Sequence, residues 1–258
     1  SELDSSQADA KLEVQLVNQF LTEVANISGF NFSPHVLRKT SDILSPDMIG
    51  YNGQNFAAVL NHLLGTNNRK RKRDVFWRRT RGRYTIRPKN MRRPMIDIGD
   101  AYGEILPFLK DVKTDEVIDS TNVTMRFKEN HLKKKFYGVD HLSDGSLKFL
   151  ALTVAIALSN YTLLYLEEVE NYLNPRALSF LMEMMEEYSD DFNVQFLLTT
   201  HSETVLNRSK PEEVIISKRL EKGSTSYVRP KNLSTLRDEL DEGGFGLGTY
   251  WGTGGIES

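Results

Sequence analysis

The feature that most constrains the fold is an alternation of helix and strand patterns that starts at residue 143. The stretch "SDGSLKFLALTVAIALSN" opens with small, turn-forming residues and continues as a nearly all-apolar helix. "YTLLYLEE" and "NVQFLLTT" follow as short apolar runs, and each precedes another helical pattern. Continuous apolar runs suit strands in a sheet covered on both faces. We therefore predict an α/β fold with a mostly parallel sheet flanked by helices.

Upstream of this alternation the patterns are less regular. Residues 8–25 carry apolar side chains at helical spacing, and residues 97–110 are expected to form a further helix. "STNVTMRFKEN" has the composition of a strand, whereas the region before it is dominated by helices and an insert. We expect two parts: a helical and insert region over residues 1–118, and an α/β lobe over residues 119–258.

The insert stands out by its charge. Between Arg69 and Arg93 there are thirteen Lys or Arg and one acid, about +12, which leaves about −14 on the rest of a chain whose net charge is −2. Interleaved aromatics would suit phosphate contacts with base stacking. A solvated loop and a docking site for an acidic protein remain open as alternatives. The candidate phosphate-binding residues are Arg69, Lys70, Arg71, Lys72, Arg73, Arg78 and Arg79.

Composition excludes several classes of protein. Without cysteine, the chain has neither disulfides nor thiolate metal sites, which fits a reducing, cytoplasmic setting. No apolar stretch approaches the roughly 20 residues of a bilayer span, and the N-terminus lacks the pattern of a signal peptide. We expect no membrane partner.

Acids and a histidine follow the two apolar strands. Glu167 and Glu168 end the first, and His201 comes directly after the second. Ligands of α/β sheets collect beyond the carboxyl ends of the strands, where a carboxylate can hold hydrated Mg²⁺ and its neighbour can activate water. The simpler interpretations are a solvated strand end for the acids and a helix cap or buried histidine for His201. Glu170 is expected to be a turn residue rather than a ligand.

A third element precedes the apolar helix. In "LSDGSLK", Ser143, Gly145 and the unpaired N–H groups of a helix start form a candidate anion site, although Ser143 can equally be a simple N-cap. Together with the acid pair, this element indicates phosphoryl transfer from a nucleotide.

"LSDGSLKFLALTVAIAL", "LLYLEEVENYLNP" and "FLLTTHSETVL" resemble, in order and spacing, the signature, Walker B, D-loop and H-loop motifs of ABC-type ATPases, especially the SMC/RecF/OLD-like group of AAA-type ATPases. The resemblance extends to "LSPDMIGYNGQNFAAVLNHL" and to the "GLGTYW" tail. It implies an ABC-ATPase head, C-terminal lobe, that uses ATP and Mg²⁺ in a head-to-head dimer.

The resemblance also implies roles for single residues. Glu167 corresponds to the acid that holds Mg²⁺, Glu168 to the carboxylate that polarises water, and His201 to the histidine that contacts the γ-phosphate. Ser143 and Gly145 match signature residues that act on the partner subunit's nucleotide. Basic Lys148 closes the signature, and Asn174 occupies a D-loop position at the dimer interface. Both are expected, with Ser143 and Gly145, to be nucleotide-binding residues.

The chain departs from this family at three points. Val169 replaces the usual proline after the acids, Asn174 stands where histidine or aspartate is common, and no G-x-x-x-x-G-K-[ST] motif occurs. We therefore expect a C-terminal part whose P-loop comes from another segment or subunit.

The expected function is ATP hydrolysis that moves DNA or an effector protein, in DNA maintenance or phage defence. The alternatives are a non-catalytic scaffold derived from an ATPase and a nucleic-acid-binding module.

Overall fold

The computed structural model describes most of the chain, namely residues 14–21, 24, 26–45, 48–64, 75–80, 83–88, 106, 108–131, 135–158, 161–221 and 223–254. For residues 75–80, 83–88, 158 and 192 it describes the backbone alone.

A parallel sheet lies at the centre of the fold. Its order is β1 (Ile27–Phe30), β8 (Leu163–Leu166) and β9 (Gln195–Leu198), and both pairings are parallel. The α/β class predicted from the helix and strand alternation is thus confirmed. Phe30, Leu164 and Leu166 point into the core.

The opposite face of this sheet is less covered than the sequence suggested. Along β8, the residues that alternate with the buried leucines are only partly buried. On the flanking strands, Ile27 is 51% exposed and Leu197 is 48% exposed. Within the described residues, the sheet therefore has one well-packed face, whereas complete burial of both faces was expected.

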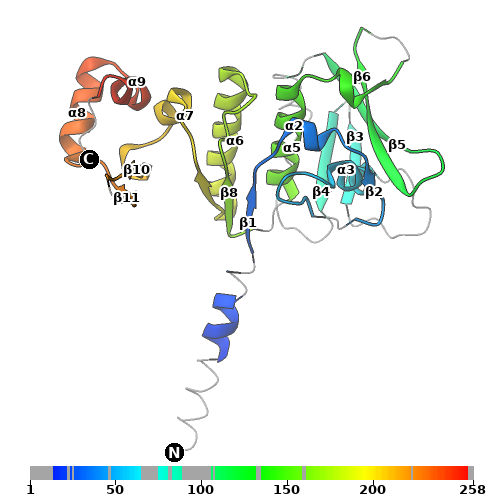
Figure 1. The fold of residues 1–258 in the computed structure, drawn as a ribbon, viewed down its shortest axis with the longest axis horizontal. Coiled ribbons are helices and arrows are strands. Elements are labelled where there is room, and N and C mark those ends of the chain that lie inside the picture. Colours follow the sequence, from blue (N-terminus) through cyan, green and yellow to red (C-terminus); the bar gives the residue numbers. More distant parts are fainter. Residues whose placement is uncertain are drawn as a thin grey trace, which may run out of the picture.

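Two long helices lie beside the parallel sheet and share its core (Figure 1). In α5 (Asp144–Leu158) almost every described side chain from residue 146 onward is buried. In α6 (Pro175–Phe192) the apolar side chains repeat at helical spacing on one face. The Asn174 side chain accepts the N–H of Ala177 at 2.9 Å, and Pro175 takes the first helical position, which is the usual pattern of a helix start.

A second sheet is antiparallel, with the order β2 (Ser41–Asp42), β6 (Asn122–Glu129) and β5 (Leu109–Glu116), and short β7 (Tyr137–Gly138) pairs with β6. One face packs on α3 (Phe56–Leu64) through buried Val123, Met125 and Phe127. The expected boundary after residue 118 falls in the turn between β5 and β6, so the two regions share this sheet.

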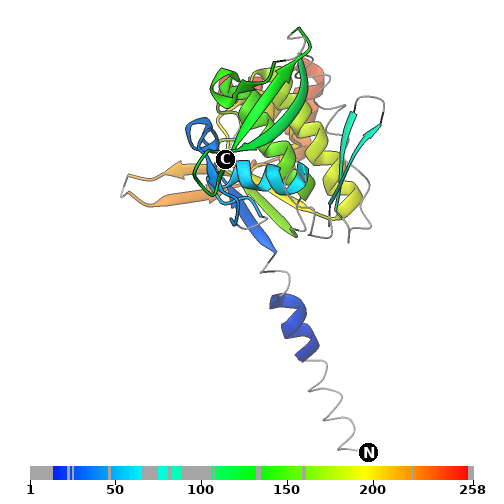
Figure 2. The same ribbon diagram turned by 90° about the vertical axis from the view of Figure 1, so that its right-hand side faces the viewer.

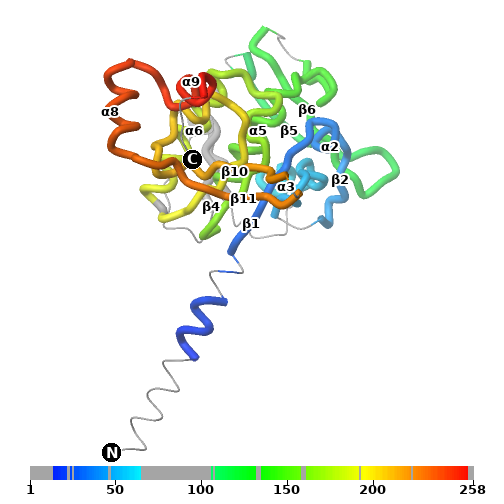
Figure 3. The backbone as a smooth tube through the Cα atoms, turned by 60° about the vertical axis from the view of Figure 1, so that its left-hand side comes forward, coloured from blue at the N-terminus to red at the C-terminus, as the bar shows by residue number. Residues whose placement is uncertain are grey.

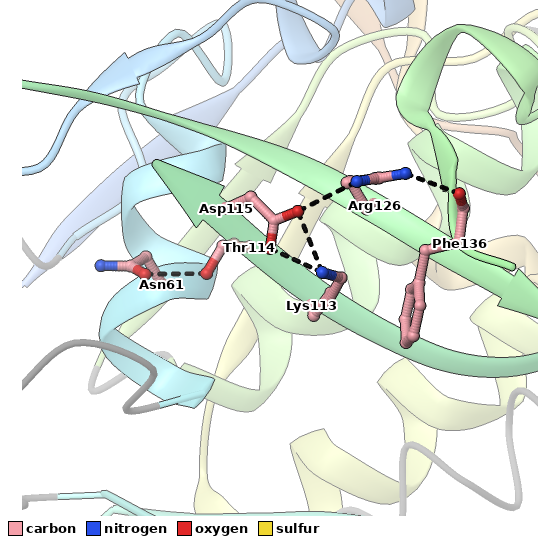
Figure 4. A network of polar contacts seen from close by, with 6 residues as sticks. All are labelled: Asn61, Lys113, Thr114, Asp115, Arg126 and Phe136. Atoms are coloured by element: carbon pink, nitrogen blue, oxygen red, sulfur yellow. Dashed lines mark hydrogen bonds and ion pairs between the residues drawn. The ribbon is translucent and has the colours of Figure 1, made fainter. Parts of the chain in front are cut away.

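Polar contacts join α3 to the antiparallel sheet and link the sheet's strands to each other (Figure 4). The buried Thr114 hydroxyl donates to Asn61 Oδ1 at 2.7 Å. Nearer the surface, Asp115 accepts from Lys113 at 2.7 Å and from Arg126 at 3.2 Å. Arg126 also donates to the carbonyl of Phe136 at 2.7 Å, which fixes the segment before β7. Since the ion pairs are partly exposed, they orient strands more than they stabilise them.

The basic insert contains a hairpin that its sequence did not reveal. β3 (Val75–Thr80) pairs antiparallel with β4 (Arg83–Pro88), and the register sets Phe76 opposite Arg87 and Arg79 opposite Tyr84. Arg69 to Arg73 lie outside the described residues. So does most of the helix expected over residues 97–110, and at its end Leu109 and Lys110 begin β5 instead.

After β9 the chain forms α7 (Glu203–Arg208), a hairpin of β10 (Ile216–Arg219) and β11 (Thr225–Val228), α8 (Leu233–Gly243) and α9 (Leu247–Gly252). The hairpin projects from the body, as Figure 2 shows. α8 and α9 lie together at one end of the molecule (Figure 3). Asn207 of α7 accepts the N–H of Gly248 at 2.7 Å, which docks α9 on the helix that follows His201.

The N-terminal helical pattern is partly seen. Residues 14–21 are helical and stand away from the body in every view (Figures 1 to 3), and their apolar side chains are exposed. Within the part of the chain that the structure describes, no helix has the length and apolar character needed to cross a bilayer.

Candidate functional site

The loops that follow β8 and β9 are neighbours, because adjacent parallel strands end at the same edge of their sheet. We call residues 167–173, directly after β8, the acid loop. The N–H of Glu168 donates to the Thr199 hydroxyl at 3.0 Å, which joins this loop to the end of β9. The structure thus brings Glu167, Glu168 and His201 to one edge of the sheet.

Glu167 is held by donors on both carboxylate oxygens. Asn31, just beyond β1, donates to Oε2 at 2.7 Å, and the Tyr165 hydroxyl donates to Oε1 at 3.1 Å. Hydrogen bonds from Tyr51 and Tyr165 lower the pKa of Glu167, and the bond to Glu167 raises the pKa of Tyr51. Glu167 is therefore ionised and fixed in direction at neutral pH.

Glu168 has a more exposed carboxylate and an unusual backbone. Its φ is +42°, in the left-handed region that non-glycine residues adopt only where neighbouring contacts hold them. The side chain of Asn171 donates to its carboxylate, and the backbone N–H of Asn171 donates to its carbonyl at 3.0 Å. The residue is exposed, and it directly follows the ionised Glu167 in the acid loop.

Glu170 connects the acid loop to the residues around His201. Its carboxylate accepts the His201 N–H at 2.6 Å and the Thr200 hydroxyl at 2.8 Å. The sequence suggested a plain turn residue here, and these bonds were not foreseen because their partners lie about thirty residues away. Val169, which stands in place of the family's proline, is fully buried, so that position keeps an apolar contact with the core.

The start of α5 is fixed by a cap and by a distant arginine. The Ser143 hydroxyl accepts the N–H of Ser146 at 3.2 Å, which is the N-cap geometry. Arg38 donates to the carbonyl of Leu142 at 2.6 Å and pairs with Asp144 at 2.6 Å. Ser143 remains exposed at this helix start.

The same helix, α5, contacts the acid loop through Lys148 and Gly145. Lys148 is 2% exposed, and its ammonium donates to the carbonyl of Glu168 at 3.0 Å. Burial lowers the pKa of Lys148 to about 8, against the opposing effect of the charges on Glu170 and Glu168. A Cβ on Gly145 would lie 2.5 Å from the Tyr172 carbonyl oxygen, so only glycine allows this close approach.

The carboxylates at this edge of the sheet match one mode of metal binding. Among the described residues, no cluster of three or more His, Cys, Asp or Glu side chains could form a protein cage for a metal ion. Mg²⁺ usually binds through one or two carboxylates, with water and substrate phosphates completing its shell. An ionised Glu167 beside the exposed Glu168 carboxylate fits that mode.

Several residues at this edge gave no signal in the sequence. Asn31 and Arg38 act across sequence separations of 136 and 104 residues. Thr199 and Thr200 lie within the motif that contains His201, but the sequence gives no sign of their hydrogen bonds to the acid loop. Of the basic candidates, Arg78 and Arg79 lie on β3, where only the backbone is described.

The structure is similar to parts of solved SMC heads. An SMC ATPase from work on ATP-driven dimerization and DNA-stimulated activation matches with a TM-score of 0.41 and 14% identity, over 55% of this chain and 86% of the other. The SMC head domain from Thermotoga maritima matches with a TM-score of 0.32 and 18% identity, over 41% of this chain and 38% of that one.

The Smc head from Pyrococcus furiosus, with an extended coiled coil and bound to the C-terminal domain of ScpA, gives a TM-score of 0.40 and 15% identity, over 55% of this chain and 35% of that one. The chain thus spans well under half of the last two structures. No curated protein sequence matches the chain.

A family model gives the stronger result. The family described as "AAA domain, putative AbiEii toxin, Type IV TA system" matches residues 24–207, well over half of the chain. The matched span includes the acid loop, His201 and the start of α5. The chain belongs to this family of AAA domains.

Proposed function

We propose that this chain is the C-terminal lobe of an ATPase that binds and hydrolyses ATP with Mg²⁺. One observation carries the proposal: the acid loop and the loop with His201 lie at the same edge of the parallel sheet and are joined by direct hydrogen bonds. Membership of the AAA family supports an ATP-binding, ATPase-type function in general terms. The roles of single residues are our assignment.

Glu167 would hold the hydrated Mg²⁺, which neutralises charge on the phosphates when bound. Glu168 would accept a proton from the attacking water, since its exposed carboxylate lies one residue further into the acid loop. His201 would donate to the γ-phosphate from the neighbouring loop. Its position depends on the bond between its own N–H and Glu170.

The nucleotide would lie between two chains. We propose that a P-loop comes from another segment or subunit, and that Ser143 and Gly145 at the start of α5 meet the nucleotide of the partner in a head-to-head dimer. The exposed Ser143 supports a contact of this kind. Asn174 caps α6 and directly follows the acid loop. This position would lie at the dimer interface. A cytoplasmic location and a role in DNA maintenance or phage defence belong to the same proposal.

ATP binding and turnover test the function directly. The chain alone is expected to bind ATP weakly, and mixing it with a P-loop-bearing segment should restore hydrolysis. Glu168→Gln should then keep ATP bound while slowing turnover by about 100-fold or more. The matched control is Glu186→Gln, an exposed acid on α6 that should leave turnover unchanged. Tight ATP binding by the chain alone, or full turnover by Glu168→Gln, would contradict the assignment.

Nucleic-acid binding through the basic segment is a second candidate. The β3–β4 hairpin favours it, since its register sets aromatic residues opposite arginines. Duplex DNA affinity should fall steeply as salt rises, and neutralising Arg69 to Arg73 should flatten that dependence. If the salt dependence of DNA affinity does not change, a solvated loop or a protein-docking segment is the better explanation. A lobe that shows no ATP turnover would favour the non-catalytic scaffold.

A further inference from the structure

The acid loop has a strained backbone that neighbouring elements hold in place. Glu168 has φ of +42° and Tyr172 has φ of +68°, and neither is glycine. This backbone region is unfavourable for residues that carry a Cβ, so the conformation persists only where neighbouring contacts determine it. The end of β9 provides one set of these contacts through Thr199 and Thr200.

The second set of contacts comes from α5, and Lys148 is central to it. Its ammonium lies 3.0 Å from the carbonyl oxygen of Glu168 and 5.9 Å from the centre of the Tyr172 ring. One side chain therefore contacts both strained residues of the loop. The Glu168 carbonyl also accepts the N–H of Asn171 at 3.0 Å, so Lys148 bonds to the atom that closes the turn.

Stability of the fold alone does not explain a lysine at position 148. Its neighbours on α5, Leu147 and Phe149, are fully buried, and Lys148 itself is 2% exposed. An apolar side chain of similar length would avoid the desolvation of an ammonium and is often neutral or stabilising in such a place. What an apolar side chain cannot do is donate to the Glu168 carbonyl.

We propose that Lys148 is a positioning residue that fixes the backbone of Glu168, and through it the direction of the Glu168 carboxylate. In this role Lys148 acts from inside the protein, with its ammonium against the acid loop, instead of as the nucleotide-binding residue that the sequence suggested. Since it lies one helical turn after the exposed start of α5, it also links the candidate anion site at Ser143 to the acid loop. The assignment rests on the proposed function only in treating Glu168 as the residue that activates water.

Hydrogen exchange of the full chain, without nucleotide, tests the positioning itself. Lys148→Met keeps the length of the side chain and removes the donor. We expect the amides of Glu168 and Asn171 to exchange about 10- to 100-fold faster in this variant, the range for losing a hydrogen bond to a charged group. The midpoint of global unfolding should stay the same or rise, because the buried charge is gone.

Two further variants make the comparison specific. Thr153→Val alters a fully buried polar residue on the same helix, whose hydroxyl donates to the Phe149 carbonyl one turn earlier at 2.8 Å. It should leave the acid loop unchanged. Lys148→Arg restores a charged donor and should return exchange at Glu168 to within about threefold of the parent chain. If Lys148→Met does not fold, Lys148→Gln gives the same comparison with a donor too short for the 3.0 Å contact.

A second readout separates positioning from folding. With a P-loop-bearing segment present, Lys148→Met should lower kcat about 10- to 100-fold and leave the KM for ATP within about twofold, and Lys148→Arg should recover most of kcat. Unchanged exchange in the acid loop, or equal loosening in Thr153→Val, would overturn the proposal. If no ATPase activity appears with any P-loop segment, the proposed function fails, whereas the exchange result still decides the role of Lys148.

Discussion

The carboxylate of Glu170 accepts the backbone N–H of His201 at 2.6 Å, and its second oxygen accepts the hydroxyl of Thr200 at 2.8 Å. Because these residues lie in the loops after β8 and β9, this carboxylate and the bond from the Glu168 N–H to Thr199 together set the spacing between the two acids and the histidine. The placement of His201 therefore depends on a residue that has no chemical step of its own in the proposed reaction.

Glu170→Ala should release the loop after β9. Since the His201 N–H loses a charged acceptor, we expect its amide to exchange at least about tenfold faster and the free energy of unfolding to fall by about 1–3 kcal/mol. The measurements are hydrogen exchange and urea unfolding. Glu183→Ala is the matched control, because Glu183 forms a half-exposed ion pair with Arg208 that should contribute less than about 1 kcal/mol. Equal effects in the two variants would show that the link through Glu170 is unimportant.

Gly145→Ala should displace the acid loop, since the new Cβ would lie 2.5 Å from the Tyr172 carbonyl oxygen and a backbone atom cannot move aside cheaply. We expect a loss of about 1–3 kcal/mol in the free energy of unfolding. Gly138→Ala is the control: nothing lies within 4 Å of its Cβ, and its extended backbone, φ −70° and ψ 162°, accepts alanine. That variant should be neutral or more stable by up to about 1 kcal/mol. If Gly145→Ala is as stable as Gly138→Ala, the two elements are not in tight contact.

Much of the fold from residue 143 onward could be predicted, because the elements there follow local rules. Each signal there is encoded within a few residues: the spacing of apolar residues in α5 and α6, the cap formed by Asn174, and the short apolar runs of β8 and β9. Because parallel strands end at the same edge of their sheet, the predicted parallel pairing is enough to place the acids near His201.

The rest of the site depends on contacts between distant segments. The bond between Asn31 and Glu167 spans 136 residues, and nothing around Asn31 indicates an acid as its partner. The burial of Lys148 follows from the position of the acid loop over α5, whereas the sequence suggests only a basic residue at the end of a motif. In the β3–β4 hairpin, the arginines interrupt the alternation that would have indicated strands.

The buried Lys148 predicts a change of stability at alkaline pH. Its pKa in the folded chain is about 8, below the ordinary 10.5, so the unfolded chain binds more protons between these values. Stability should therefore rise as pH increases from about 8 to about 10.5, by roughly 1–3 kcal/mol from this group. The difference between the parent chain and Lys148→Arg isolates the effect, because arginine stays charged throughout and other groups cancel. A constant difference between pH 7.5 and 10 would contradict the burial of the ammonium.

Tyr165→Phe should raise the pKa of Glu167, because the hydroxyl that donates to Oε1 at 3.1 Å is removed and the ring is kept. In the parent chain the pKa of Glu167 is lowered by Tyr51 and Tyr165, so its stabilising contribution is present at neutral pH and is lost as pH falls through the folded-state pKa. The variant should lose that contribution at a higher pH than the parent chain.

Carbon-detected NMR titration of the Glu167 carboxyl group measures this directly, and acid unfolding should begin at a higher pH in Tyr165→Phe. The matched control is Tyr250→Phe, which removes a hydroxyl that donates to Glu239 at the surface near the C-terminal end. That change should leave the titration of Glu167 where it was, since Glu239 lies on α8. If Tyr165→Phe also leaves it unmoved, the hydroxyl of Tyr165 has no part in keeping Glu167 ionised, and Asn31 and Tyr51 would have to account for the lowered pKa alone.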